Sequence, residues 1–102
     1  MDLKKKQLLK VSNPQTVQNK AKKYLNDSNV KINLSSSKNK KYSIVNPKNN
    51  KTVNFGDIRY TDFTKHHDEK RRQSYLSRAK SIKGNWKHDK YSPNNLSIHL
   101  LW

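Results

Sequence analysis

The chain has 102 residues, of which 23 are lysine or arginine and 7 are aspartate or glutamate, so its formal net charge is +16. Hydrophobic residues make up 30% of it, against roughly 45–50% of apolar residues, glycine included, in an ordinary globular domain. This composition argues against a large enzyme with a deep pocket, and the absence of cysteine excludes disulfide scaffolds, cysteine-ligated zinc and thiol nucleophiles.

Residues 1–37 are predicted to form a basic N-terminal arm. Residues 1–12 have the polar, lysine-rich character of a tail. Asn13 and Pro14 then suit the N-cap and the first position of a helix, and apolar side chains follow them at helical spacing. This pattern predicts a helix near residues 14–26.

Alternating apolar residues predict a short strand after this helix, because polar side chains separate Val30, Ile32 and Leu34. The polar run 35–41 is typical of a linker. We therefore place a domain boundary within this run, with residues 38–102 forming the compact part of the chain.

The fold predicted for this compact part is a small α+β domain that begins with a β-hairpin. Residues 42–46 and 52–55 have strand character, and Pro47 with the asparagines that follow it supplies turn chemistry between them. An isolated hairpin is only marginally stable in water, so a further element must cover one of its faces.

Two helices are predicted after the hairpin. The first spans residues 66–82 and carries an apolar stripe of Tyr75, Ala79 and Ile82, which we expect to pack on the hairpin. Its neighbouring face gathers three basic side chains and a serine at helical spacing: Lys70, Arg71, Ser74 and Arg78. The second helix is short and C-terminal, and begins after a capping signal at Ser92.

The charge of the chain favours a polyanionic partner. Its excess positive charges repel one another in a compact domain, and nucleic acid is the commonest polyanion that relieves such repulsion. Lysine is spread along the chain, whereas all four arginines fall within residues 59–78. Because arginine holds phosphate in a bidentate fork, this cluster indicates phosphate contacts more specifically than the total charge does.

The candidate nucleic-acid-binding residues follow from this cluster. Those expected to contact phosphate are Arg59, Lys70, Arg71, Arg72, Arg78, Lys80 and Lys83. Non-specific affinity is expected from lysines of the arm, namely Lys4, Lys5, Lys6, Lys20, Lys22 and Lys23. The candidates for stacking on unpaired bases are Tyr60, Phe63 and Trp86. The competing interpretation is a solvated helix face beside aromatic rings that supply the bulk of the core.

Histidine and aspartate residues raise the question of a catalytic site. His66, His67 and His99 have side chains that can bind a metal, and their layout is faintly similar to the His-Asn-His arrangement of a ββα-metal nuclease. The fit is poor because a long basic helix separates the two halves, where that motif needs a tight hairpin. In this basic chain, Asp62 and Asp68 are instead expected to form ion pairs with arginines of the cluster.

Several segments after residue 37 form a distinctive combined pattern. It includes Val-Asn-Phe-Gly-Asp at 53–57, Tyr-Thr-Asp-Phe-Thr-Lys-His at 60–66, Asp-Glu-Lys-Arg-Arg-Gln-Ser-Tyr-Leu-Ser-Arg-Ala at 68–79 and Leu-Leu-Trp at 100–102. This pattern resembles a family of small basic proteins of uncharacterised function encoded by giant nucleocytoplasmic large DNA viruses (mimivirus-like), with related strings in tailed phages. The resemblance implies a viral source, with residence in the virion or in the infected host cell (the viral factory), and it implies no particular activity.

We therefore expect a small basic viral protein that binds nucleic acid, DNA or RNA, mainly through phosphate contacts and without catalysis. No cofactor, no bound metal and no membrane partner is expected. The alternative is a minor structural protein of the capsid or virion that acts through protein–protein contacts, and a metal-dependent nuclease is the remote alternative.

Overall fold

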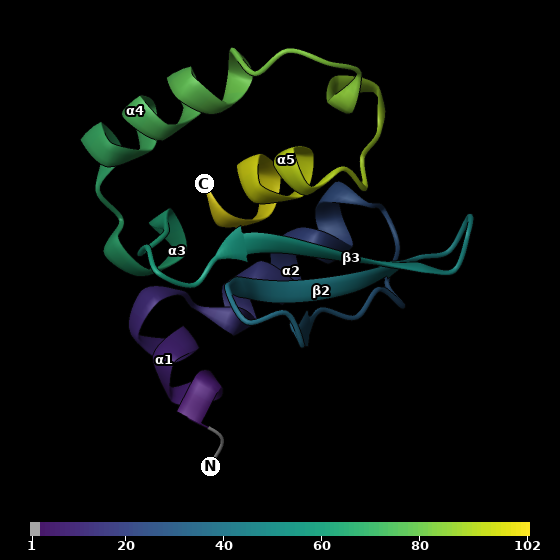
Figure 1. Ribbon diagram of the computed structural model, residues 1–102, viewed down its shortest axis with the longest axis horizontal. Helices are drawn as coiled ribbons and strands as arrows, with labels where there is room; N and C mark the ends of the chain where they lie inside the picture. Colours follow the sequence, from purple (N-terminus) through teal and green to yellow (C-terminus); the bar gives the residue numbers. More distant parts are fainter. Residues whose placement is uncertain (1–2) are drawn as a thin grey trace.

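The computed structural model describes residues 3–102 and contains a three-stranded antiparallel sheet, of which Figure 1 labels β2 and β3. The strands are β1 (Asn33–Leu34), β2 (Lys40–Asn46) and β3 (Lys51–Asp57), in the order β1-β2-β3. The predicted hairpin of β2 and β3 is confirmed, with Tyr42 paired to Phe55. Its turn places Asn50 at a φ of 56°, a left-handed conformation that asparagine tolerates.

The first strand is shorter than predicted. The structure pairs Asn33 and Leu34 with β2, whereas Val30 and Ile32 are bonded to the side chain of Gln18. The Gln18 amide donates to the carbonyl of Val30 over 2.8 Å and accepts from the N–H of Ile32 over 2.8 Å. One amide side chain thus takes the backbone groups that a longer strand would have used.

Two helices precede the sheet, α1 (Leu3–Val11) and α2 (Pro14–Tyr24). The prediction of the second is confirmed, and the side chain of Asn13 caps it by accepting from the N–H of Thr16. The prediction of a tail over residues 1–12 is wrong for residues 3–11, because Leu8 is buried and anchors a helix there. Residues 1–2 of that prediction lie outside the described residues.

The predicted helix over residues 66–82 is in fact two helices, α3 (Phe63–His66) and α4 (Glu69–Lys80). His67 separates them because it adopts a left-handed backbone with a φ of 55°. Asp68 then begins the second helix as its N-cap, accepting from the N–H groups of Lys70 and Arg71. An N-cap residue has a non-helical backbone conformation, so the cap at Asp68 interrupts the continuous helix that the sequence periodicity predicted.

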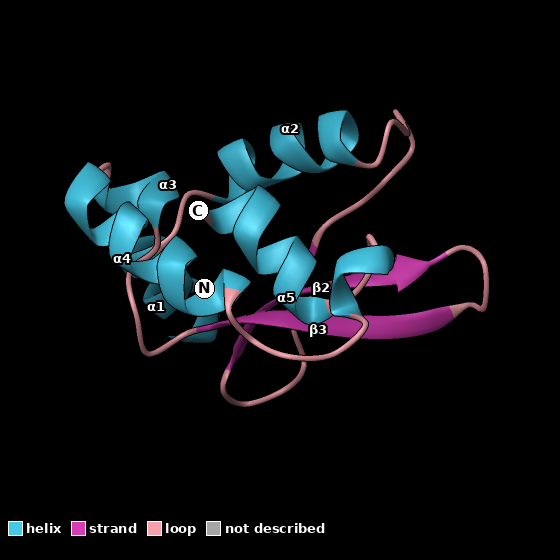
Figure 2. Cartoon of the chain, turned by 90° about the horizontal axis from the view of Figure 1, so that it is seen from above, coloured by secondary structure: helices cyan, strands magenta, loops and turns pink. Residues whose placement is uncertain are grey.

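The C-terminal segment forms the 3-10 turn η1 (Trp86–His88), then α5 (Pro93–Leu96), which continues as the π-helical turn η2 (Ser97–Leu101). The predicted C-terminal helix is confirmed, and the Ser92 hydroxyl caps it by accepting from the N–H of Asn95 over 3.2 Å. Figure 2 shows α5 beside α2 on the side of the sheet that carries the helices.

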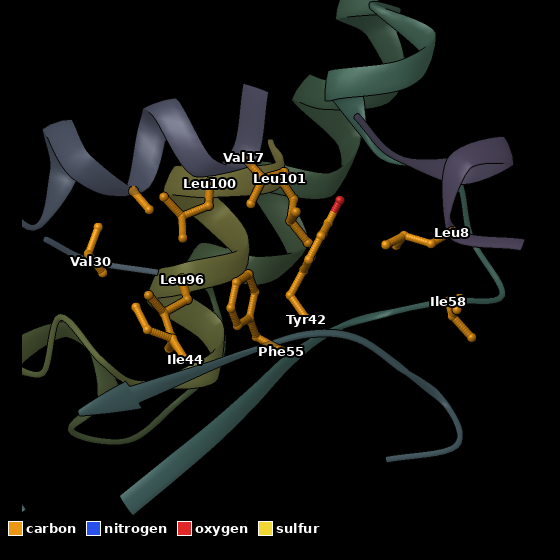
Figure 3. Packing of buried hydrophobic residues seen from close by; sticks show 11 residues of the cluster. Leu8, Val17, Val30, Tyr42, Ile44, Phe55, Ile58, Leu96, Leu100 and Leu101 are labelled. Atoms are coloured by element: carbon orange, nitrogen blue, oxygen red, sulfur yellow. The ribbon is translucent and has the colours of Figure 1, made fainter. Parts of the chain in front are cut away.

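The main core lies between the sheet and these two helices (Figure 3). Its fully buried members come from α2, β2, β3 and the C-terminal helix: Val17, Ala21, Tyr42, Ile44, Phe55, Leu96, Leu100 and Leu101. Residues on both sides of residue 37 share this core, so the two N-terminal helices pack as part of the same domain.

Helix α4 does not cover the hairpin, which corrects the prediction for its apolar stripe. Leu76 and Ala79 pack with Ile98 in a separate, smaller group that we call the α4 cluster, and Ile82 is half exposed. The C-terminal helix covers the sheet instead because its three buried leucines present a wider apolar face. No helix within residues 3–102 combines the length and the apolar character that a membrane span requires.

Candidate nucleic-acid interface

A groove of about 900 Å³ lies between α4, the C-terminal helix and the neighbouring ends of β2 and β3. The basic side chains that line it are Lys40, Lys41, Lys70, Arg71 and Arg78. Two carboxylates, Asp57 and Asp68, also line it, so positive charge prevails along the groove. The structure therefore brings three of the predicted phosphate contacts, Lys70, Arg71 and Arg78, to one place.

The start of α4 determines how these three side chains are presented. The Asp68 cap fixes the first turn, and Lys70, Arg71, Ser74 and Arg78 then recur along one helix face, as the sequence predicted. Within residues 3–102, the ion pairs engage Lys41, Arg59 and Arg72, and none of them engages the three cations of this face. We call the exposed side chains of Lys70, Arg71 and Arg78 the α4 basic face.

Arg59 has a different environment from the one predicted. Its guanidinium makes a bidentate pair with Asp57, with Nε 3.0 Å and Nη2 2.8 Å from the two carboxylate oxygens. These hydrogen bonds lower the pKa of Asp57 to about 2. Arg59 thus orders the chain at the end of β3, outside the groove. Its charge offsets that of Asp57, which is one of the two carboxylates that line the groove.

Arg72 is also engaged within the protein. Its Nε donates to the carbonyl oxygen of Trp102 over 2.8 Å, and its Nη1 donates to Glu69 over 2.9 Å. The guanidinium carbon also lies 5.6 Å from the centre of the Phe63 ring. Arg72 therefore connects α4 to α3 and to the C-terminus, and it faces away from the groove.

The remaining predicted phosphate contacts lie apart from the groove. Lys80 lines a second hollow, and Lys83 is exposed in the segment that follows α4. Among the arm lysines, Lys4 donates to the carbonyls of Ser35 and Ser37. Lys20 also lines the second hollow, and the exposed residues Lys5, Lys6, Lys22 and Lys23 are spread over the two N-terminal helices.

The three candidate stacking residues have unequal exposure. Tyr60 is 65% exposed and lines the groove. Phe63 is packed against the rings of His66 and His67. Trp86 is half buried, and its indole N–H donates to the carbonyl of Ile82 over 2.7 Å. Of these three candidates, Tyr60 is thus the one whose ring is open to a ligand in the groove.

Two further aromatic residues of the groove were missed by sequence reasoning. The rings of Tyr75 and Trp102 stack with centroids 4.3 Å apart and planes 13° from parallel. Tyr75 lies on the apolar side of α4, where its spacing indicated core, and Trp102 reaches it from the end of the chain. No local motif links two residues so far apart in the sequence.

One of the residues that line the groove, Lys41, belongs to a buried ion pair. The ammonium of Lys41 lies 3.0 Å from the carboxylate of Asp62, and the two side chains are 2% and 0% exposed. Burial lowers the pKa of Lys41, and the Asp62 carboxylate opposes this shift. Asp62 was expected to pair with an arginine and instead pairs with a lysine of β2, while Asp68, for which the same was expected, caps α4.

The same aspartate joins three elements. Asp62 caps α3 by accepting from the N–H and the hydroxyl of Thr64, and its own N–H donates to the carbonyl of Val11. The Thr64 hydroxyl also accepts from the N–H of Asn13 over 2.9 Å. These bonds attach the N-terminal helices to the loop that leads into the groove.

The close approach of β3 to the C-terminal helix depends on Gly56. Its φ of 79° lies in the left-handed region, and a Cβ placed there would lie 2.8 Å from a methyl group of Leu101. A larger residue would push the helix away from the sheet at the floor of the groove.

Of the histidines considered for a metal site, His66 and His67 pack on Phe63, whereas His99 packs on a different residue, Tyr24. The Nδ1 atom of His66 accepts from the N–H of Asp68 over 2.9 Å, and its ring contacts Trp102. Burial lowers the pKa of His66. His99 stacks on Tyr24 with ring centroids 4.3 Å apart. In the part of the chain that the structure describes, no three histidine or carboxylate side chains gather as a metal site would require.

Residues 30–79 match the model of a protein family described as a family of unknown function (DUF5754). The matched segment contains the whole sheet, α3 and nearly all of α4, including the α4 basic face and the Lys41–Asp62 pair. No curated protein and no solved structure matches the chain significantly.

Proposed function

We propose that this protein binds nucleic acid through phosphate contacts made by the α4 basic face, and that it does so without catalysing a reaction. The observation that carries the proposal is the gathering of Lys70, Arg71 and Arg78 along one groove, where none of the three takes part in the ion pairs of residues 3–102. The resemblance to proteins of giant DNA viruses supports a viral setting, in the virion or in the infected cell.

The spacing of the cations suits a chain of phosphates. Arg71 and Arg78 are seven residues apart, which corresponds to about 10 Å along a helix axis. Each guanidinium can hold a phosphate in a bidentate geometry, and the Ser74 hydroxyl lies between them on the same face. The other exposed lysines would add attraction that depends on charge alone.

The aromatic ring beside these cations favours single-stranded nucleic acid. Tyr60 presents an exposed ring on the same groove, and unpaired bases stack on such rings while cations hold the backbone. In a duplex the bases are already stacked on one another, so Tyr60 would contribute little. We therefore expect single strands to bind more tightly than a duplex of the same sequence.

Fluorescence anisotropy with labelled single-stranded DNA, duplex DNA and RNA tests the proposal, at about 50 and about 200 mM salt. The test variant is Arg71→Ala/Arg78→Ala. The control, Lys48→Ala/Lys51→Ala, removes the same charge at the hairpin turn, which Figure 1 shows at the opposite end of the molecule from α4.

We expect binding that weakens steeply with salt and weakens far more in the α4 variant than in the control. Absence of binding at about 50 mM salt by the folded protein would overturn the proposal. Equal losses in the two variants would show that total charge, and not the α4 basic face, accounts for affinity.

The second candidate function is that of a minor structural protein of a capsid or virion. Exposed apolar side chains favour it: Leu3 and Leu9 on α1 are 80% and 39% exposed, and Val45 on β2 is 50% exposed. Such a protein would be abundant in purified particles and would associate with a capsid subunit through these residues. Replacement of Leu3 and Leu9 by serine would then abolish incorporation while leaving nucleic-acid binding intact.

A further inference from the structure

A second hollow, of about 460 Å³, lies on the other side of α4 from the groove, among α2, α4, η1 and η2. Its basic side chains are Lys20, Arg72, Lys80, Lys87 and His99. No aspartate or glutamate side chain is among the described residues that line it, although Glu69, which does not line it, pairs with Arg72. This distinguishes the hollow from the groove, where Asp57 and Asp68 offset part of the positive charge.

Four different elements bring these side chains together. Lys20 comes from α2, Arg72 and Lys80 lie two turns apart on α4, Lys87 belongs to η1, and His99 belongs to η2. Two of them are held in place by neighbouring groups. Arg72 is fixed by Trp102 and Glu69, as described above, and the ring of His99 stacks on Tyr24.

The side chains in the hollow repel one another electrostatically. Burial lowers the pKa of Lys20 and the charge of Arg72 lowers it further, while the charge of Asp62 opposes part of this shift. Burial also lowers the pKa of His99, and the charges of Lys80, Lys90 and Lys20 add to this effect. Both groups therefore lie where the protein disfavours a positive charge, and an anion in the hollow would reverse that preference.

We propose that this hollow binds a polyphosphate group, either as free tripolyphosphate or as the phosphate tail of a nucleoside triphosphate. A single carboxylate or chloride would neutralise one of several cations, whereas linked phosphates carry several negative charges within a few ångströms. Arg72 supplies a preorganised guanidinium, and Lys20, Lys80 and Lys87 supply flexible ammonium groups that can close around the chain of phosphates.

This site is separate from the proposed nucleic-acid interface and does not depend on it. The two lie on opposite sides of α4, and Trp102 is the one described residue that lines both. The protein can therefore bind polyphosphate even if it does not bind nucleic acid through the α4 basic face, and it can bind nucleic acid there even if it does not bind polyphosphate.

The test measures binding of tripolyphosphate and of ATP by isothermal titration calorimetry at constant ionic strength. The variant Lys80→Ala/Lys87→Ala removes two cations of the hollow, and Arg71→Ala/Arg78→Ala removes two cations of the groove. We expect the first variant to bind at least tenfold more weakly than the wild type and the second to bind as the wild type does. Equal affinity for the two ligands would show that the hollow recognises the phosphate chain alone. Tighter binding of ATP would show that it also recognises the nucleoside.

The ring protons of His99 give an independent readout by NMR. The charged groups around His99 are Lys20 from α2, Lys80 from α4, Lys87 from η1 and Lys90. The ammonium of Lys90 lies over the Tyr24 ring, on which His99 stacks. A bound polyphosphate stabilises the imidazolium, so the pKa of His99 should rise on binding, while His66, His67 and His88 serve as internal controls.

Three results would overturn the proposal. The first is absence of binding by both ligands. The second is binding that the Lys80→Ala/Lys87→Ala variant retains in full. The third is a His99 titration that does not change when the ligand saturates the protein.

Discussion

The main core and the α4 cluster differ in how they hold their helices. The main core joins the sheet, α2 and the C-terminal helix through residues that are almost completely buried, among them Phe55 and Leu100. The α4 cluster has three buried members, Leu76, Ala79 and Ile98. Two hydrogen bonds add to it, from Arg72 to the Trp102 carbonyl and from Asn94 to the Ala79 carbonyl.

This difference separates stability from the proposed function. The α4 basic face and two cations of the second hollow, Arg72 and Lys80, lie on α4, the helix with the smaller apolar attachment. Substitutions on the exposed sides of α4 should therefore change binding with little effect on the fold, whereas substitutions in the main core should do the opposite. The following predictions test that separation, beginning with the largest expected effect.

The largest effect is expected from Asp62→Asn. This variant leaves the ammonium of Lys41 buried without a countercharge, which should lower the free energy of unfolding by about 3–5 kcal/mol. Chemical denaturation measures the change. Asp57→Asn is the matched control because it breaks an ion pair whose arginine is 61% exposed, and it should have a much smaller effect. Similar losses in the two variants would contradict the structural role given to the buried pair.

Leucine truncation compares the two apolar groups directly. Leu100→Ala in the main core should lower the free energy of unfolding by about 3–5 kcal/mol, since the side chain is fully buried among others. Leu76→Ala in the α4 cluster should cost about 2 kcal/mol, near the lower end of the range for such changes. In Leu76→Ala, but not in Leu100→Ala, the backbone amides of α4 should also exchange hydrogen faster than those of β2 and β3. A larger loss of unfolding free energy in Leu76→Ala than in Leu100→Ala would contradict the smaller apolar attachment of α4.

Removal of the α4 cap should have a local effect. Asp68→Ala deletes the acceptor for the N–H groups of Lys70 and Arg71, which should lower stability by about 1 kcal/mol. Because the cap fixes the first turn, binding of single-stranded DNA should weaken despite the loss of a negative charge from the groove. Tighter binding in Asp68→Ala would indicate that charge outweighs the positioning of the first turn.

The smallest expected effect concerns pH. The pKa of Asp57 in the folded protein is about 2, below the ordinary value of about 3.9 for an aspartate in an unfolded chain. The pair with Arg59 therefore stabilises the fold fully above about pH 4, and this contribution disappears as the pH falls through 2. The Tm difference between the wild type and Asp57→Asn should vanish over that interval. A difference that stays constant from pH 5 to pH 2 would contradict the assignment.

The parts of the fold that were predicted from sequence are those with a local signal. Asn13 with Pro14, and Ser92 with Pro93, each mark the start of a helix that the structure contains. The turn chemistry after Pro47 marks the hairpin in the same way. Each signal lies within a few residues of the element it predicts.

The parts that were missed depend on contacts between distant segments. The helix α1 forms where Leu8 reaches the main core, and the continuous helix predicted around His67 breaks at the Asp68 cap. The partner that covers the sheet was also misjudged, because the periodicity of α4 and that of the C-terminal helix are alike in the sequence. Only the three-dimensional arrangement decides which apolar face is the wider one.

The candidate site divides in the same way. Helical periodicity placed Lys70, Arg71 and Arg78 on one face, and the structure shows all three along one groove. It could not show that Arg59 is held by Asp57 or that Arg72 is held by Trp102, since these depend on loop geometry and on the chain end. The Lys41–Asp62 pair had no sequence signal beyond two common residue types.

The salt dependence of single-strand binding tests the central claim most directly. Each phosphate contact on a single strand contributes about 0.7 to the slope of log K against log salt concentration. We predict that Arg71→Ala/Arg78→Ala reduces this slope by about 1.4, and that Lys48→Ala/Lys51→Ala leaves it nearly unchanged. Equal slopes in the wild type and the α4 variant would contradict the claim that the α4 basic face holds the phosphates.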